Sequence, residues 1–174
     1  MVDVCFALVG SVPHNSRALR QLRALVRLGL CIEAFGFGPP AALPTNLQDA
    51  VRYHALPLPE RQGPRFFWQA HRRLSAALRT RRARVYHASD LYVLPALAAA
   101  ARRHGGRLVF DARERYPYVA GTAGRPLRQH FWKLVERRYI RRADLVLTVS
   151  DGIAEHLVRD YGIAPPLVLY NAPE

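Results

Sequence analysis

Short apolar runs alternate along the chain with longer segments in which apolar residues recur at helical spacing. Each run is too short for a helix and is bounded by Gly, Pro or polar residues, as buried strands usually are. Strands that alternate with helices favour a parallel sheet. We therefore predict an α/β fold with a doubly wound, mostly parallel sheet of about seven strands and helices on both faces. The predicted strands lie within residues 2–9, 30–37, 51–56, 85–88, 107–110, 144–150 and 167–170.

Helix signals separate these strands. Asn15 or Ser16 is the natural N-cap of the first helix, and Asp90 and Ser150 are placed to cap later ones. Residues 38–50 are predicted to be a surface connection, and residues 121–124 a flexible segment that can move over a ligand.

The later helices have apolar stripes that should face the sheet. These stripes are Phe67, Ala70, Leu74, Ala77 and Leu78 in residues 64–82, and Phe131, Trp132, Val135 and Tyr139 in residues 126–142, where Glu136 and Arg137 are candidates for an ion pair.

The size and cysteine content favour one domain in a reducing compartment. A chain of 174 residues, half of them apolar, can bury a single core. Cys5 and Cys31 lie in apolar runs without metal-binding spacing, so we expect buried free thiols and no metal site. The N-terminus lacks a signal-peptide pattern, and no apolar run reaches the roughly 18 residues of a spanning helix. We expect a cytoplasmic protein.

Polar side chains gather where predicted strands end. Asp111, Arg113 and Glu114 follow the fifth strand. Because ligands of open parallel sheets bind at the carboxyl ends of the strands, these residues are candidates for the floor of a site, although a solvated strand-to-loop turn is an alternative. Gly10 and Ser11 lead from the first strand to a helix N-terminus, which favours an anion. His14 and Arg17 either point at that anion or are solvated, and His87 is either a site residue or a core imidazole.

The chain is strongly basic, with 26 Lys and Arg against 13 Asp and Glu, for a net charge of +13. Such a charge points to polyanionic partners. In the helix over residues 64–82, Trp68 shares an outward face with Arg65, Arg72 and Arg79. This face predicts contact with an anionic membrane surface, so the protein is expected to be cytoplasmic and, on this reading, peripheral on the inner face of the cell membrane. The alternative is that Trp68 packs under the Pro-rich loop and the arginines are solvated.

Several segments occur in an order that resembles a known family. They are residues 86–95 (YHASDLYVLP), residues 109–117 (VFDARERYP), Trp132 with Glu136 and Arg137, residues 143–150 (ADLVLTVS), and Tyr161–Gly162 with residues 171–173 (NAP). The set resembles the N-terminal half of a family 4, GT-B-fold retaining glycosyltransferase. The resemblance covers nearly the whole chain.

This resemblance implies a Rossmann-like N-terminal domain over residues 1–170, with residues 171–174 beginning a hinge. In such enzymes this domain mainly holds a saccharide or lipid-linked acceptor, and a second domain, absent from this sequence, holds the nucleotide-sugar. The fragment alone is expected to be inactive, and no cofactor is expected. Arg113 replaces a histidine usual in the family, and Ser89 replaces another. Arginine cannot act as a base at neutral pH, but it can clamp pyrophosphate as charge builds on the leaving group.

The site residues that follow from the pattern and the resemblance fall into two groups. The catalytic candidates are Asp111, Arg113 and Glu114, and the substrate-binding candidates are Gly10, Ser11, His14, Asn15, Arg17, His87, Ser89, Asp90, Tyr92 and Ser150. Two other functions remain open. One is a basic module that binds nucleic acid or phosphate, although no nucleic-acid-binding motif is present and no nucleic-acid partner is expected. The other is a GT-B-like sugar-nucleotide epimerase.

Overall fold

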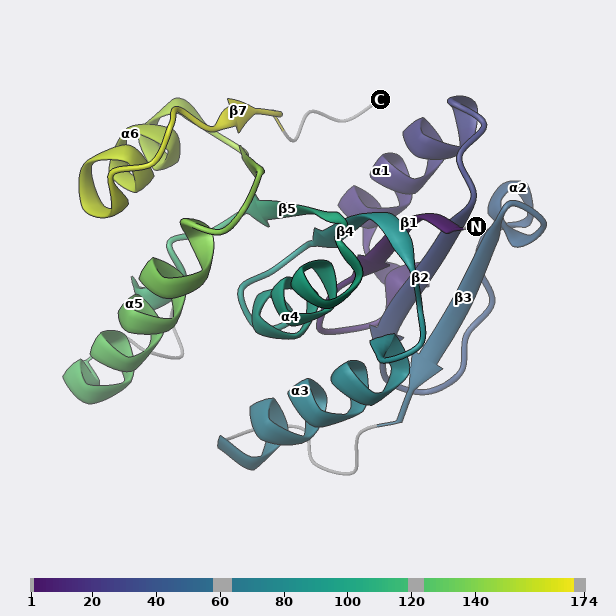
Figure 1. The fold of residues 1–174 in the computed structure, drawn as a ribbon, viewed down its shortest axis with the longest axis horizontal. Helices are drawn as coiled ribbons and strands as arrows, with labels where there is room; N and C mark the ends of the chain where they lie inside the picture. Colours follow the sequence, from purple (N-terminus) through teal and green to yellow (C-terminus); the bar gives the residue numbers. More distant parts are fainter. Residues whose placement is uncertain (1, 58–63, 119–123, 171–174) are drawn as a thin grey trace.

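The computed structural model describes residues 2–57, 64–118 and 124–170, and its centre is a seven-stranded parallel sheet (Figure 1). The order of the strands is β3-β2-β1-β4-β5-β6-β7, so the chain runs outward from β1 to one edge and then returns to build the other half. Their bounds are Val2–Ala7 (β1), Ile32–Phe37 (β2), Val51–Leu56 (β3), Ala83–Ala88 (β4), Arg107–Ala112 (β5), Leu145–Thr148 (β6) and Leu167–Val168 (β7). The predicted α/β, Rossmann-like fold is confirmed.

Helices cover both faces of the sheet, as predicted (Figure 1). One face carries α1 (Ser16–Arg27) and the short α2 (Thr45–Gln48). The other carries α3 (Pro64–Leu78), α4 (Leu94–His104), α5 (Pro126–Ile140) and α6 (Asp151–Tyr161). Two short 3₁₀ turns, η1 (Val12–His14) and η2 (Tyr116–Tyr118), follow β1 and β5. Because helices cover both faces of the sheet, the polar loops that follow the strands lie between the two layers of helices.

Alternation along the strands divides the core in two. In β1, Phe6 packs with Leu22 of α1 on one face, while Cys5 and Ala7 join Leu74 of α3 on the other. All of these side chains are buried. Since successive residues of a strand point to opposite faces, continuous apolar sequence is what a sheet covered on both faces requires.

Helix boundaries agree with the capping signals at two of three places. The side chain of Asn15 accepts a hydrogen bond from the Ala18 N–H at 2.9 Å, and that of Ser150 accepts one from the Ile153 N–H at 3.4 Å. Asp90, predicted to cap α4, does not: the N-cap position there is Val93, without a side-chain hydrogen bond. α4 begins instead with Pro95 in its first turn, where a missing N–H costs nothing.

Some apolar positions differ from the sequence prediction. The connection over residues 38–50 contains α2 and buries Leu43 and Leu47 in the core, because a short amphipathic turn covers the edge of the sheet. Cys31 is exposed rather than buried, since β2 begins one residue later. Phe131 is also exposed, at 57%. The flexible segment over residues 121–124 falls mostly outside the described residues, as does the hinge over residues 171–174.

In α5, Glu136 does not pair with Arg137. It is 1% exposed and accepts a hydrogen bond from the Tyr161 hydroxyl at 2.6 Å. Adjacent helical residues point about 100° apart, so Glu136 faces α6 while Arg137 faces outward. Burial raises the pKa of Glu136 to about 7. None of the helices in the described parts of the chain has the length and apolarity needed to cross a bilayer.

Candidate functional site

The carboxyl ends of the central strands lie at one edge of the sheet. Ala7 of β1 is level with Ala88 of β4, which is level with Phe110 of β5. Further along, Ala112 of β5 is level with Thr148 of β6. This register brings the loops after β1, β4, β5 and β6 together, as the sequence predicted for the first and fifth strands.

The loop after β1 is held close to β2. Gly10 has a φ of +120°, and its carbonyl accepts a hydrogen bond from the Phe37 N–H at 2.8 Å. Gly36 of β2 makes this approach possible, because a Cβ there would lie 2.8 Å from the Gly10 carbonyl oxygen. Beyond Gly10, the Ser11 hydroxyl lies 2.8 Å from Nδ1 of His14. Both residues are thereby fixed next to the start of α1.

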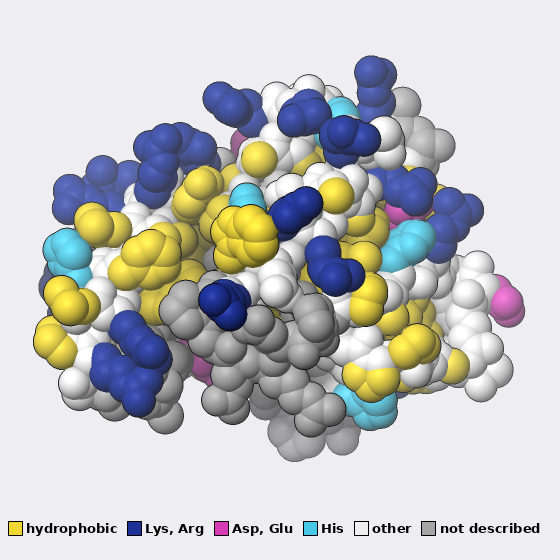
Figure 2. All heavy atoms as spheres, turned by 90° about the horizontal axis from the view of Figure 1, so that it is seen from below, with side chains coloured by type: hydrophobic (Ala, Val, Ile, Leu, Met, Phe, Trp, Pro, Cys, Tyr) yellow, Lys and Arg dark blue, Asp and Glu magenta, His cyan; other side chains and the backbone are white. Residues whose placement is uncertain are grey.

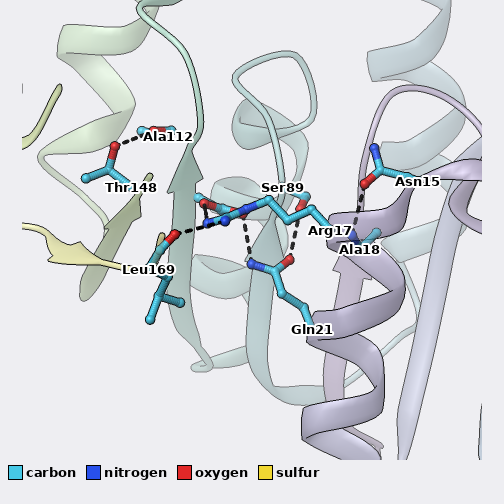
Figure 3. A network of polar contacts seen from close by, with 9 residues as sticks. Asn15, Arg17, Ala18, Gln21, Ser89, Ala112, Thr148 and Leu169 are labelled. Carbon is cyan, nitrogen blue, oxygen red and sulfur yellow. Dashed lines mark hydrogen bonds and ion pairs between the residues drawn. The ribbon is translucent and has the colours of Figure 1, made fainter. Parts of the chain in front are cut away.

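A buried ion pair connects α1 to β5. Arg17 donates from Nε and Nη2 to the two carboxylate oxygens of Asp111 at 2.9 and 2.8 Å, and from Nη1 to the Leu169 carbonyl at 3.1 Å. Gln21, one turn further along α1, donates to Asp111 at 2.9 Å (Figure 3). Its carbonyl accepts a long bond from the Ser89 hydroxyl at 3.5 Å. Asp111 is fully buried and all of its described partners are donors.

Asp90 organises the loop after β4. One carboxylate oxygen accepts the Val9 N–H at 2.5 Å, and the other accepts the N–H groups of Tyr92 and Val93 at 2.9 and 3.1 Å. Asp90 is 3% exposed, and burial raises its pKa while these N–H groups oppose the rise. The carboxylate therefore fastens the loop after β1 to the loop after β4.

His87 lies in β4, just before the loop that contains Asp90, and Tyr92 follows Asp90 by two residues. His87 is 7% exposed and packs on the Phe6 ring, with 4.8 Å between ring centroids. Burial lowers its pKa to about 4, so the imidazole is neutral at pH 7, and its Nε2 has no partner among the described residues. The Tyr92 ring packs against Phe67 at 4.6 Å and Trp132 at 4.9 Å, in an aromatic cluster under α3 and α5.

An open depression of about 480 Å³ lies above this network. It is lined by His14, Asn15, Ser16, Arg17, Arg113, Glu114 and Val149. The first turn of α1 contains no acidic residue, so its free N–H groups and the helix dipole leave a positive potential. Arg113 is half-buried and Glu114 is exposed. Arg113 lies beside Tyr116, whose pKa burial raises well above its usual value, and the nearby guanidinium opposes that rise.

The structure brings together five of the predicted site residues at this depression and places the others behind or beside it. His14, Asn15, Arg17, Arg113 and Glu114 line it. Ser11 contacts His14, and Ser150 follows Val149 while capping α6. The remaining candidates lie in the supporting loops and network described above: Gly10, His87, Ser89, Asp90, Tyr92 and Asp111.

Gln21 and Val149 are members of the site that the sequence did not single out. Gln21 lies four residues after Arg17, so it shares the inward face of α1, and that spacing is the signal that could have found it. The side chain of Val149 has no polar group, so no pattern in the sequence marked it as a site residue. Among the described residues, no three His, Cys, Asp or Glu side chains are grouped so that they could hold a metal ion.

Comparisons with known proteins identify the family of the sequence and agree with the fold. The glycosyl transferase 4-like domain family matches the sequence over residues 14–173. A comparison with curated protein sequences finds no match. Among solved structures, the chain is similar to sucrose-phosphate synthase (tll1590) from Thermosynechococcus elongatus, with a TM-score of 0.68 and 14% identity over 98% of this chain and 47% of that one.

Two other solved structures show the same likeness. One is Anabaena Alr3699/HepE in complex with UDP and glucose, with a TM-score of 0.66 and 15% identity, covering 100% of this chain and 45% of that one. The other is the lipopolysaccharide outer core galactosyltransferase WaaB in its apo form, with a TM-score of 0.62 and 13% identity over 99% and 46%. The chain thus spans just under half the length of these structures.

Proposed function

Because the chain belongs to the glycosyl transferase 4-like domain family, we propose that it is the acceptor-side half of a glycosyltransferase that uses a nucleotide-sugar. The observation that carries the proposal is the depression where the first turn of α1 meets Arg113. Helix N–H groups and a guanidinium are the donors that a pyrophosphate requires. Support for this donor class comes from Anabaena HepE, whose structures are in complex with UDP and with UDP-glucose.

In this proposal Arg113 is the phosphate clamp. It is half-buried at the rim of the depression, and no described carboxylate lies within ion-pair distance of it. A planar guanidinium can bind two phosphate oxygens at once, and the interaction strengthens as negative charge develops on the leaving group. Transfer with retention of configuration then needs no protein base, since the leaving phosphate itself can take the proton of the acceptor hydroxyl.

The other polar residues are assigned supporting roles. Glu114 is exposed beside Arg113 and is proposed to accept hydrogen bonds from sugar or acceptor hydroxyls. Asp111 fixes Arg17 and thereby the first turn of α1, so it is a positioning residue rather than a reacting carboxylate. The acceptor is proposed to be a saccharide or a lipid-linked saccharide. Residues 171–174 are proposed to begin the hinge to a donor-binding domain, without which no transfer is expected.

Titration with UDP, followed by NMR chemical shifts, tests the clamp. Arg113→Ala is expected to weaken binding by at least about tenfold, the effect of losing one charge-assisted contact, and Arg113→Lys by less. Arg115→Ala is the matched control, because Arg115 is two residues away and packs over the Tyr118 ring at 4.6 Å. Wild-type affinity in Arg113→Ala, or an equal loss in Arg115→Ala, would remove the clamp. So would wild-type turnover by an intact enzyme that carries Arg113→Ala.

A further inference from the structure

The outward surfaces of α3 and α5 combine exposed apolar side chains with arginines. On α5, Leu127, Phe131 and Leu134 are 87%, 57% and 52% exposed. Their spacing of four and three residues places them on one stripe of the helix. The stripe faces away from Glu136 and Ile140, which are the buried residues of α5. An amphipathic helix usually buries its apolar stripe in the core, whereas this stripe faces away from the core.

α3 provides the second half of this surface. Trp68 is 60% exposed, and the guanidinium of Arg72 lies over its ring at 5.4 Å. The neighbouring Phe67 ring meets Trp132 of α5 edge-on at 4.9 Å. The first turns of α3 therefore contact α5 through Phe67 and Trp132, whereas α4 packs between the remaining parts of the two helices.

The charge on this surface has one sign. α3 contains no Asp or Glu, and the only carboxylate of α5 is the buried Glu136. The exposed basic side chains of the two helices include Arg65, Arg72, Arg73, Arg128, Arg137 and Arg138. None of them forms an ion pair with a described carboxylate. In the view from below, Lys and Arg side chains lie among hydrophobic ones over α3 and α5, with little Asp or Glu visible (Figure 2).

We propose that the α3–α5 surface, formed by Arg65, Trp68, Arg72, Leu127, Phe131 and Leu134, docks on an anionic lipid bilayer. Arginines attract anionic headgroups, and the indole and aliphatic side chains insert at the boundary of the acyl chains. This composition distinguishes the surface from one that binds nucleic acid, because exposed leucines contribute nothing to phosphate contacts. The predicted membrane face of α3 is thereby extended to a second helix.

Crossover helices begin at the carboxyl end of the strand before them, so the first turns of α3 and α5 are expected toward the edge of the sheet that carries the depression. A lipid-linked acceptor held in the bilayer would meet the protein at this edge. That acceptor class rests on the proposed function, whereas docking on the bilayer does not.

Vesicle co-sedimentation of the purified protein tests the proposal. Binding is expected to vesicles of equal parts phosphatidylglycerol and phosphatidylcholine, to fall in 0.5 M salt, and to be weak on phosphatidylcholine alone. Arg65→Gln and Arg72→Gln should each lower the partition coefficient about fivefold. The triple variant Leu127→Ser, Phe131→Ser, Leu134→Ser should lower it roughly tenfold or more. Leu28→Ser and Arg27→Gln, on the other face of the sheet, are the matched controls and should change nothing.

The outcomes separate the possibilities. Equal binding by the wild type and the triple variant, or equal losses in the controls, overturns the docking surface. Tight, salt-dependent binding to DNA or RNA without binding to anionic vesicles also overturns it and favours a nucleic-acid partner. All substituted side chains are exposed, so each variant should have the melting temperature of the wild type. Equal melting temperatures verify that the variants are folded. UDP titration of the same variants shows whether the candidate site is intact, so the failure of one proposal is distinguished from the failure of the other.

Discussion

Arg17 and Asp111 lie 94 residues apart in sequence and are joined through two hydrogen bonds at 2.9 and 2.8 Å. Asp111 is fully buried and Arg17 is 8% exposed. The pair fixes the first helix to the fifth strand directly under the depression. Its removal should therefore change both stability and anion binding.

Arg17→Met is expected to destabilise the protein strongly. It leaves a buried carboxylate without its charge partner, which costs about 3–5 kcal/mol in comparable cases. The double variant Arg17→Met, Asp111→Leu should recover much of that loss, because it removes both charges. Urea unfolding of the two variants at pH 7 measures the difference. If the double variant is no more stable than the single one, the ion pair is not the cause.

His87 should make stability fall in mild acid. Its pKa in the folded chain is about 4, below the 6.5 of an unperturbed imidazole, because burial disfavours the charged form. The folded state thus binds fewer protons, so its stability is full above pH 6.5 and decreases as the pH falls toward 4, by about 3 kcal/mol. Urea unfolding between pH 7 and pH 4 should show this slope in the wild type and lose it in His87→Asn. An unchanged slope in the variant would contradict the assignment.

Glu136 should make stability fall as the pH rises, which is the opposite of the effect of His87. Burial raises its pKa to about 7 from 4.5, so the folded state binds more protons than the unfolded chain. Stability is then greatest below pH 4.5 and decreases as the pH rises through 7, by about 3 kcal/mol. Glu136→Gln should remove this decrease. The comparison is the urea midpoint at pH 5 and pH 8, and a variant that keeps the full difference shows that another group titrates.

Gly36→Ala should disturb the candidate site by displacing the loop after β1. A Cβ at this position would lie 2.8 Å from both the Gly10 carbonyl oxygen and the Tyr53 hydroxyl, so the loop after β1 must move. We expect a loss of about 1–3 kcal/mol in stability and weaker UDP binding. Gly152→Ala is the control, since nothing lies within 4 Å of its Cβ and alanine favours the helix. Equal behaviour of the two variants in unfolding and UDP titration would argue against the close approach.

Local patterns in the sequence predicted much of the fold. The apolar runs gave the strands, and the side chain of Asn15 caps α1 as its position indicated. Trp68, which lies off the apolar stripe of α3, is 60% exposed, as in the outward-facing alternative of the two that the sequence left open. These features depend on residues only a few positions apart, where spacing carries the information.

The contacts that build the site depend on distant residues. The bond from Arg17 to Leu169 spans 152 positions and that from Asp90 to Val9 spans 81, so no local pattern reports them. The sequence placed Asp111 at the right edge of the sheet but could not show that Arg17 and Gln21 occupy it. Similarly, the partner of Glu136 is Tyr161, on another helix, rather than the adjacent Arg137.

The third bond of Arg17 couples two elements that would otherwise fray separately. β7 has only two residues, and a strand that short at the edge of a sheet is expected to open readily. The Leu169 carbonyl just beyond it is held by the same guanidinium that fixes the start of α1. A phosphate that draws Arg17 away from the Leu169 carbonyl would therefore loosen the edge strand as it binds.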